Sequence, residues 1–310
     1  MAPALPWRSA ACTDQGKVRE RNEDAILECP QQGLWAVADG MGGHRAGDIA
    51  SQMIVTSLGE LTQAQSFDQR LDAVRQCLHW LNRRMGQELT VSDQHADTLM
   101  GSTVVALLLE GQRGACVWAG DSRCYLWRGR QLYQLSRDHS LQQQLMDEHA
   151  MSSEQAQAQP GARALTRAVG ASEHLNLSVV ELEVLPDDVF LLCSDGLYQN
   201  LSHSEMSNAL SLISPQVALA RLFDGVLRGD ARDNISAVVI RQLAHCQPCS
   251  AGGIASSVCW ARVAWARCIG RVICFRNSSV TRSLTSPLKC SAKPMNSHRM
   301  PAPCSSTSMR

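Results

Sequence analysis

Four short apolar segments follow one another between residues 102 and 135, and they constrain the fold more than any other part of the chain. The segments are STVVALLLE (102–110), RGACVWAGD (113–121), SRCYLWRG (122–129) and QLYQL (131–135). Tight, glycine-containing turns separate them, which is typical of an antiparallel meander. The chain shows no regular alternation of strands and helices, and this disfavours a doubly wound nucleotide-binding fold.

The other segments before residue 244 predict more strands and two pairs of helices. Apolar runs of strand length cover 25–29, 33–39, 175–184, 188–195 and 234–243. Apolar residues recur at helical spacing over 44–62 and 67–90, and shorter helices are expected near 203–212 and 215–228. The glutamine-rich residues 140–160 predict a mobile helical excursion. We therefore expect an α+β fold with helices on the outer faces of two antiparallel sheets.

The formal net charge of zero hides a strong asymmetry. Nine of the 29 basic residues and none of the 29 acidic residues lie after residue 244. Residues 1–244 thus have a net charge of −9, which excludes a general nucleic-acid binder. Their six irregularly spaced cysteines are those of a reduced, cytoplasmic protein. We find no signal peptide and no clear membrane span, and we expect a monomer.

Residues 245–310 differ from the rest of the chain. They are rich in serine, cysteine, arginine and proline, and they have no clean periodicity. We expect a disordered, basic tail that follows a catalytic domain at 1–244. A membrane-surface helix over 254–275 is an alternative, although its three arginines do not form one polar face. The absence of acidic residues also raises the hypothesis of translation in a shifted reading frame.

Four aspartates stand at the ends of predicted strands. They are Asp39, Asp121, Asp195 and Asp233. One aspartate after a strand usually caps a turn. Four such carboxylates at one rim repel one another unless cations neutralise them, and Mg²⁺ or Mn²⁺ suits ligands that are carboxylates and water. A fifth, Asp24, follows Asn22 and Glu23 and leads into a strand.

Glycines beside Asp39 support a ligand site. Gly40, Gly42 and Gly43 follow it closely, and glycine lets the backbone approach a ligand. The carbonyl of Gly40 is itself a candidate metal ligand.

Eight segments together resemble the metal-dependent serine/threonine protein phosphatases of type 2C, in particular the bacterial branch. In order along the chain they are VRERNEDA (18–25), VADGMGGHRAGDIAS (37–51), GSTVVALLL (101–109), WAGDSRCYLWR (118–128), LSRDHS (135–140), LTRAVG (165–170), LLCSDGLYQNL (191–201) and DNISAVVI (233–240). The resemblance implies a four-layer α-β-β-α sandwich with a binuclear Mn²⁺ or Mg²⁺ site. It also implies that residues 140–165 form a flap that affects substrate access.

The resemblance assigns roles to individual residues. Asp39 would bridge two metal ions, with the Gly40 carbonyl, Asp195 and Asp233 as further ligands. Asp121 would hold a third, weaker ion together with Asp195. A water between the two ions would become a hydroxide that attacks phosphorus.

Arg19 lies four residues before Glu23, where the family has its phosphate-gripping arginine, and Arg21 is the second candidate. Met41 stands where animal relatives have a histidine that is a proposed acid. A metal-bound water or His44 would then protonate the leaving group. Asp138 and His139 are expected to fix a loop rather than to perform chemistry.

The expected activity is hydrolysis of phosphoserine and phosphothreonine in proteins, with the substrates of a bacterial serine/threonine kinase as partners. Two alternatives are a catalytically inactive regulatory module with the same fold and a two-metal nuclease, which the acidic charge disfavours. Other signals are weaker. They are two Cys-x5-Arg matches, at Cys77–Arg83 and Cys124–Arg130, and a zinc-like pair, Cys246 and Cys249.

Overall fold

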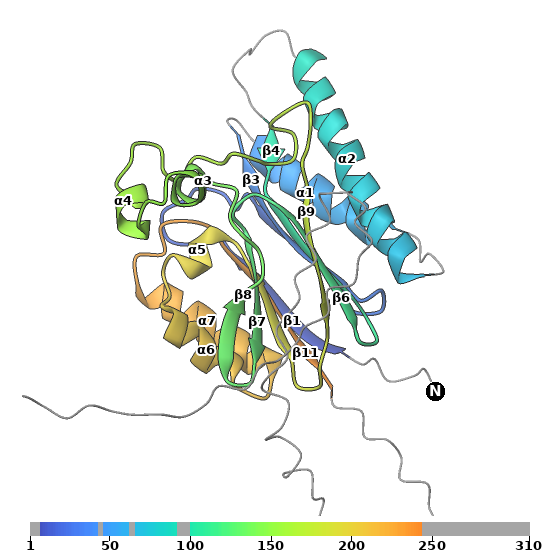
Figure 1. The fold of residues 1–310 in the computed structure, drawn as a ribbon, viewed down its shortest axis with the longest axis vertical. Coiled ribbons are helices and arrows are strands. Elements are labelled where there is room, and N and C mark those ends of the chain that lie inside the picture. Colours follow the sequence, from blue (N-terminus) through green and yellow to red (C-terminus); the bar gives the residue numbers. More distant parts are fainter. Residues whose placement is uncertain (1–6, 43–45, 62–65, 92–99, 244–310) are drawn as a thin grey trace, which may run out of the picture. The chain divides into compact units, whose positions relative to one another are not determined.

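A computed structural model describes residues 7–42, 46–61, 66–91 and 100–243, and it contains two antiparallel sheets (Figure 1). The first sheet has five strands, which are, in spatial order, β1 (Trp7–Asp14), β11 (Ile235–Gln242), β10 (Val189–Cys193), β7 (Arg123–Arg128) and β8 (Gln131–Gln134). The second sheet has, in order, β2 (Asp24–Cys29), β3 (Leu34–Met41), β5 (Val104–Glu110), β6 (Arg113–Ala119) and β9 (Ser178–Glu183), with β4 (Gly101–Ser102) on the end of β3. The predicted meander is thus divided between the two sheets.

Helices cover the outer face of each sheet (Figure 1). The helices α1 (Ala46–Gly59) and α2 (Phe67–Val91) pack on the β2–β9 sheet, and α6 (His203–Leu210) and α7 (Pro215–Arg228) pack on the other. A third apolar cluster, which includes Trp35, Phe190 and Val238, fills the space between the sheets. Alternate residues of the central strands face opposite sides, so both faces are buried. The expected α+β sandwich is confirmed.

The N-terminal strand β1 was not predicted from the sequence. Its eight residues pair with β11, from Trp7 opposite Gln242 to Asp14 opposite Ile235. Only Trp7 and Ala10 of this strand are buried, so its apolar alternation is weak. The partner strand therefore determines its conformation more than its own sequence does.

The polar excursion leaves the body at Ser140 and returns at Leu165, where the two residues form an isolated antiparallel bridge. It contains α3 (Leu141–Glu148) and α4 (Ser153–Gln157), each with a serine N-cap. The prediction of helix in this region is confirmed. The remaining helix, α5 (Asp195–Tyr198), is short and follows β10.

In the described part of the chain, no helix combines the length and the apolar character needed to cross a membrane. The tail at 245–310 lies outside the described residues.

Candidate active site

The predicted site residues gather at one rim of the sandwich. Asp39 lies near the end of β3, Asp121 follows β6, Asp195 follows β10 and Asp233 precedes β11. Because neighbouring strands are antiparallel, Asp39 and Asp121 lie at the same end of the β2–β9 sheet, and Asp195 and Asp233 lie at the same end of the other sheet.

The strand register adds Asp24 to this group. Asp24 at the start of β2 pairs directly with Asp39 on β3. Like charges directly opposite on neighbouring strands destabilise a sheet. Such a pair therefore indicates a functional site rather than a contribution to the stability of the sheet. The sequence marks Asp24 only as the residue that leads into a strand, and the register is what brings it to Asp39.

Hydroxyl groups join the two sheets below the rim. Ser194 Oγ, directly after β10, donates to Asp24 Oδ2 at 2.8 Å. Thr103 Oγ1 accepts the Asp39 backbone N–H at 3.1 Å and lies 2.7 Å from Ser122 Oγ, which follows Asp121. These bonds fix the position of Asp24, the backbone of Asp39 and the segment that follows Asp121.

Burial and mutual repulsion raise the pKa of these carboxyl groups. Burial, followed by the charges of Asp24, Asp195, Asp121 and Asp233, raises the pKa of Asp39 well above its usual value. Burial is also the largest cause for Asp24 and Asp121, whose pKa values rise to about 7, and for Asp195, whose pKa rises to about 6. Each carboxylate is therefore within electrostatic reach of others.

The chemistry of this donor set fits hard divalent cations. The buried Oδ1 of Asp24 has no hydrogen-bond partner, and the charged groups that surround Asp39 are carboxylates, which are the ligands that hard divalent cations prefer. Among the described residues, no three histidine, cysteine, aspartate or glutamate side chains are grouped closely enough to hold one ion.

Gly40 is packed too closely for any side chain. A Cβ on Gly40 would lie 2.0 Å from the carbonyl oxygen of Gly47 and 2.7 Å from that of Glu23. The glycine therefore lets α1 and the segment before β2 approach the backbone beside Asp39. Gly43 and His44 lie outside the described residues.

Arg19 lies at the same rim. Its Nη2 donates to Asp233 Oδ2 at 2.8 Å, and the two side chains are 53% and 39% exposed. The bond to Asp233 is the largest cause that raises the pKa of Arg19. The second candidate, Arg21, is exposed, and its carbonyl oxygen accepts a bond from Asn234. The geometry thus favours Arg19 as the arginine that faces the aspartates.

Asn234 holds the segment that contains Arg19, and sequence analysis did not identify it. Its Nδ2 donates to the carbonyl oxygens of Gln15 and Arg21 at 2.9 and 2.8 Å, and its Oδ1 accepts the Glu23 N–H at 2.9 Å. Asn234 is 6% exposed. The bonded residues lie on both sides of Arg19 in the chain. In the sequence, the only signal for this role is that Asn234 directly follows Asp233.

The cysteine alternatives do not fit a nucleophile. Burial raises the pKa of Cys77 to about 11 and that of Cys124 well above its usual value. Cys77 lies in α2 and Cys124 in β7, so neither begins a phosphate-binding loop. The zinc-like pair lies outside the described residues.

Comparison with known proteins identifies the family. The family profile described as protein phosphatase 2C matches residues 14–239. The chain belongs to the protein phosphatase 2C family. The resemblance in the eight segments is thereby confirmed, and the matched range includes the entire rim.

Two curated relatives illustrate the similarity. The serine/threonine protein phosphatase PstP of Mycobacterium tuberculosis is 33% identical over 235 residues, which are 76% of this chain and 45% of PstP. This chain thus spans about half the length of that relative. The serine/threonine phosphatase stp of Listeria monocytogenes is 33% identical over 203 residues, which are 64% of this chain and 81% of stp.

Solved structures of the family agree. PppA, described as a key regulatory component of the T6SS in Pseudomonas aeruginosa, has a TM-score of 0.70 and 44% identity over 76% of this chain and 98% of its own. The catalytic domain of PstP in complex with two manganese ions has a TM-score of 0.66 and 33% identity over 77% of this chain and 99% of its own.

Proposed function

We propose that this protein hydrolyses phosphoserine and phosphothreonine in proteins and that the reaction depends on Mn²⁺ or Mg²⁺. The single observation that carries the proposal is the directly opposed pair of Asp24 and Asp39, with further carboxylates within electrostatic reach. Such a concentration of negative charge is costly unless cations occupy the rim. Family membership supports the same reaction.

In this proposal, Asp39, the Gly40 carbonyl, Asp195 and Asp233 hold two ions, and Asp121 together with Asp195 holds a third. When bound, the ions supply an activated water and neutralise charge on the phosphoryl group. The guanidinium of Arg19 binds phosphoryl oxygens, for which its planar fork is suited. Because Arg19 lies beside Asp233, the bound phosphoryl group is held next to the ligands of the ions.

Protonation of the leaving serine or threonine is not assigned to a side chain. Met41 occupies the end of β3, and a thioether has no proton to give. We propose that water at the open rim supplies this proton.

The proposed substrates are phosphoproteins made by a bacterial serine/threonine kinase. The names of the curated relatives support this class, since they are called serine/threonine phosphatases. We also propose that the chain acts as a cytoplasmic monomer.

The test uses the purified full chain with a phosphothreonine peptide and Mn²⁺. Release of phosphate is expected with Mn²⁺ and is expected to stop with EDTA. Asp39→Asn and Asp233→Asn should each lose activity, whereas Asp224→Asn, on the exposed surface of α7, should keep it. Full activity in both rim variants would refute the proposal and favour a different site.

A further inference from the structure

The flap (residues 140–165) is held together mainly by contacts within itself. Ser140 pairs with Leu165, α3 packs on α4, and Gln142 Nε2 donates to Ser153 Oγ at 3.4 Å. No residue of α3 is buried, and Ala156 is the buried residue of α4. Asp147 of α3 forms an ion pair with Arg137, which precedes the flap, so the position of the flap depends on how its base is attached.

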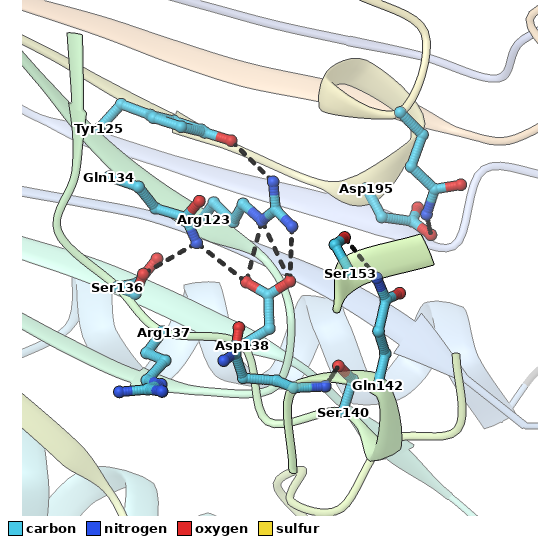
Figure 2. A network of polar contacts seen from close by, with 12 residues as sticks. Arg123, Tyr125, Gln134, Ser136, Arg137, Asp138, Ser140, Gln142, Ser153 and Asp195 are labelled. Carbon is cyan, nitrogen blue, oxygen red and sulfur yellow. Dashed lines mark hydrogen bonds and ion pairs between the residues drawn. The ribbon is translucent and has the colours of Figure 1, made fainter. Parts of the chain in front are cut away.

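Asp138, two residues before the flap, is held by Arg123 (Figure 2). Arg123 Nε donates to Asp138 Oδ1 at 2.9 Å, and its Nη2 donates to Oδ2 at 2.6 Å. The two side chains are 24% and 11% exposed, so water screens the pair poorly. A fork of two charge-assisted bonds fixes orientation as well as distance.

Arg123 also contacts a tyrosine on its own strand and a tyrosine of α5. Its Nη1 donates to Tyr125 Oη at 3.0 Å, and its guanidinium carbon lies 3.7 Å from the centre of the Tyr198 ring. Tyr198 ends α5, the helix that begins at Asp195. Arg123 itself follows Asp121 by two residues. One guanidinium therefore joins the base of the flap to the segments that carry Asp121 and Asp195.

We propose that Arg123 is a positioning residue that sets the place of the flap relative to the aspartate rim. It acts through Asp138 and Tyr198. The catalytic consequence rests on the proposed function. A phosphoprotein is large enough to contact both the flap and the rim, whereas a small aryl phosphate needs the rim alone. Loss of the fork should therefore slow the reaction with a phosphopeptide more than the reaction with an aryl phosphate.

The same strand provides a matched control. Arg128, at the other end of β7, donates from Nε and Nη2 to Asp188 at 2.8 and 2.6 Å. Its side chain is 23% exposed, close to the value for Arg123, and that of Asp188 is 1% exposed. The two pairs have similar chemistry and burial, but only the Arg123 pair reaches the base of the flap. A general loss of stability should therefore affect both pairs alike.

The first measurement is hydrogen–deuterium exchange of full-length Arg123→Lys and Arg128→Lys without substrate. Lysine keeps the charge and loses the fork. Peptides from residues 141–157 should exchange about tenfold faster in Arg123→Lys and at the wild-type rate in Arg128→Lys. Equal exchange of the flap in the two variants would overturn the positioning role. If Arg123→Lys does not fold, Arg123→Met with Asp138→Leu replaces it, with Arg128→Met and Asp188→Leu as control.

The second measurement compares kcat/KM for a phosphothreonine peptide and for p-nitrophenyl phosphate. The ratio of the two values should fall about tenfold in Arg123→Lys and stay constant in Arg128→Lys. An unchanged ratio in Arg123→Lys would contradict the proposal. A wild-type chain without any phosphatase activity would instead refute the proposed function, and the exchange comparison would still decide the role of Arg123.

Discussion

Arg19 Nη2 lies 2.8 Å from Asp233 Oδ2, although 214 residues separate the two in the chain. Arg19 belongs to the segment between β1 and β2, and Asp233 lies two residues before the start of β11. The contact therefore joins an N-terminal and a C-terminal segment of the described chain at the rim. It places the arginine that is proposed to bind phosphate beside a proposed metal ligand.

The contact predicts how Arg19 contributes to substrate binding. Arg19→Gln removes the charged donors for phosphoryl oxygens, and the loss of such bonds is worth about 1.5–3 kcal/mol. KM for a phosphopeptide should therefore rise by roughly 10- to 100-fold. The matched control is Arg21→Gln, which removes the same group from the same segment. Steady-state kinetics would contradict the assignment if Arg21→Gln had the larger effect.

Asn234 is expected to act on KM through the segment that contains Arg19. Asn234→Asp removes the two donors and places a carboxylate oxygen against the carbonyls of Gln15 and Arg21. KM should rise about tenfold, and in the Arg19→Gln background the same change should add little. A double-mutant cycle on KM measures this coupling.

Asn82 offers a control of the same geometry. Its Nδ2 donates to the carbonyls of Ser172 and Glu173 at 2.9 and 3.3 Å, and its Oδ1 accepts the Gly170 N–H at 2.8 Å. Asn82→Asp should lower the free energy of unfolding and leave KM unchanged. Additive effects of Asn234→Asp and Arg19→Gln would show that Asn234 does not act through Arg19.

The carboxylate of Asp24 is expected to lower the stability of the metal-free protein and to strengthen metal binding. Its carboxyl is buried opposite Asp39, and burial raises its pKa to about 7. Asp24→Asn removes one like charge, so the metal-free protein should melt at a higher temperature at pH 8, while more Mn²⁺ is needed for half-maximal activity. Calorimetry with EDTA and an Mn²⁺ titration measure the two effects. Glu28→Gln, on the exposed face of β2, should change neither.

The lowered pKa of His139 predicts that the free energy of unfolding decreases in acid. Burial, followed by the charge of Arg167, lowers its pKa from 6.5 to about 4. A base with a lowered folded pKa contributes stability that is present above pH 6.5 and is lost as the pH falls toward 4. At pH 4.5 this contribution amounts to a loss of about 2–3 kcal/mol. Urea unfolding at pH 7.5 and 4.5 should show a smaller decrease for His139→Asn than for wild type. Equal decreases would exclude His139 as the cause.

Local sequence predicted most of the fold. The strands 102–110, 113–121 and 188–195 are apolar on both faces and end in turns, so their own residues determine them. The strand β1 was missed because only Trp7 and Ala10 are buried, and its register comes from a distant partner. Regular structure is local, whereas the pairing of chain ends is not.

The features of the site also divide into those that local sequence predicts and those that depend on tertiary structure. Strand ends marked by aspartate predicted the rim, because a strand end is visible in the sequence. The pairing of Asp24 with Asp39 depends on register, and the bonds of Asn234 depend on how a loop folds back on β11. The anchoring of Asp138 by Arg123 agrees with the expectation that Asp138 fixes a loop. Its link to Tyr198 required the tertiary structure.

The full-length pairing of β1 with β11 has a consequence during synthesis. The edge strand β1 cannot pair until residues 235–242 of β11 have left the ribosome, long after Arg19 has emerged. Contacts this distant in sequence form late. A nascent chain that has not reached this point therefore lacks the contact between Arg19 and Asp233, and this contact can form only after β11 has been translated.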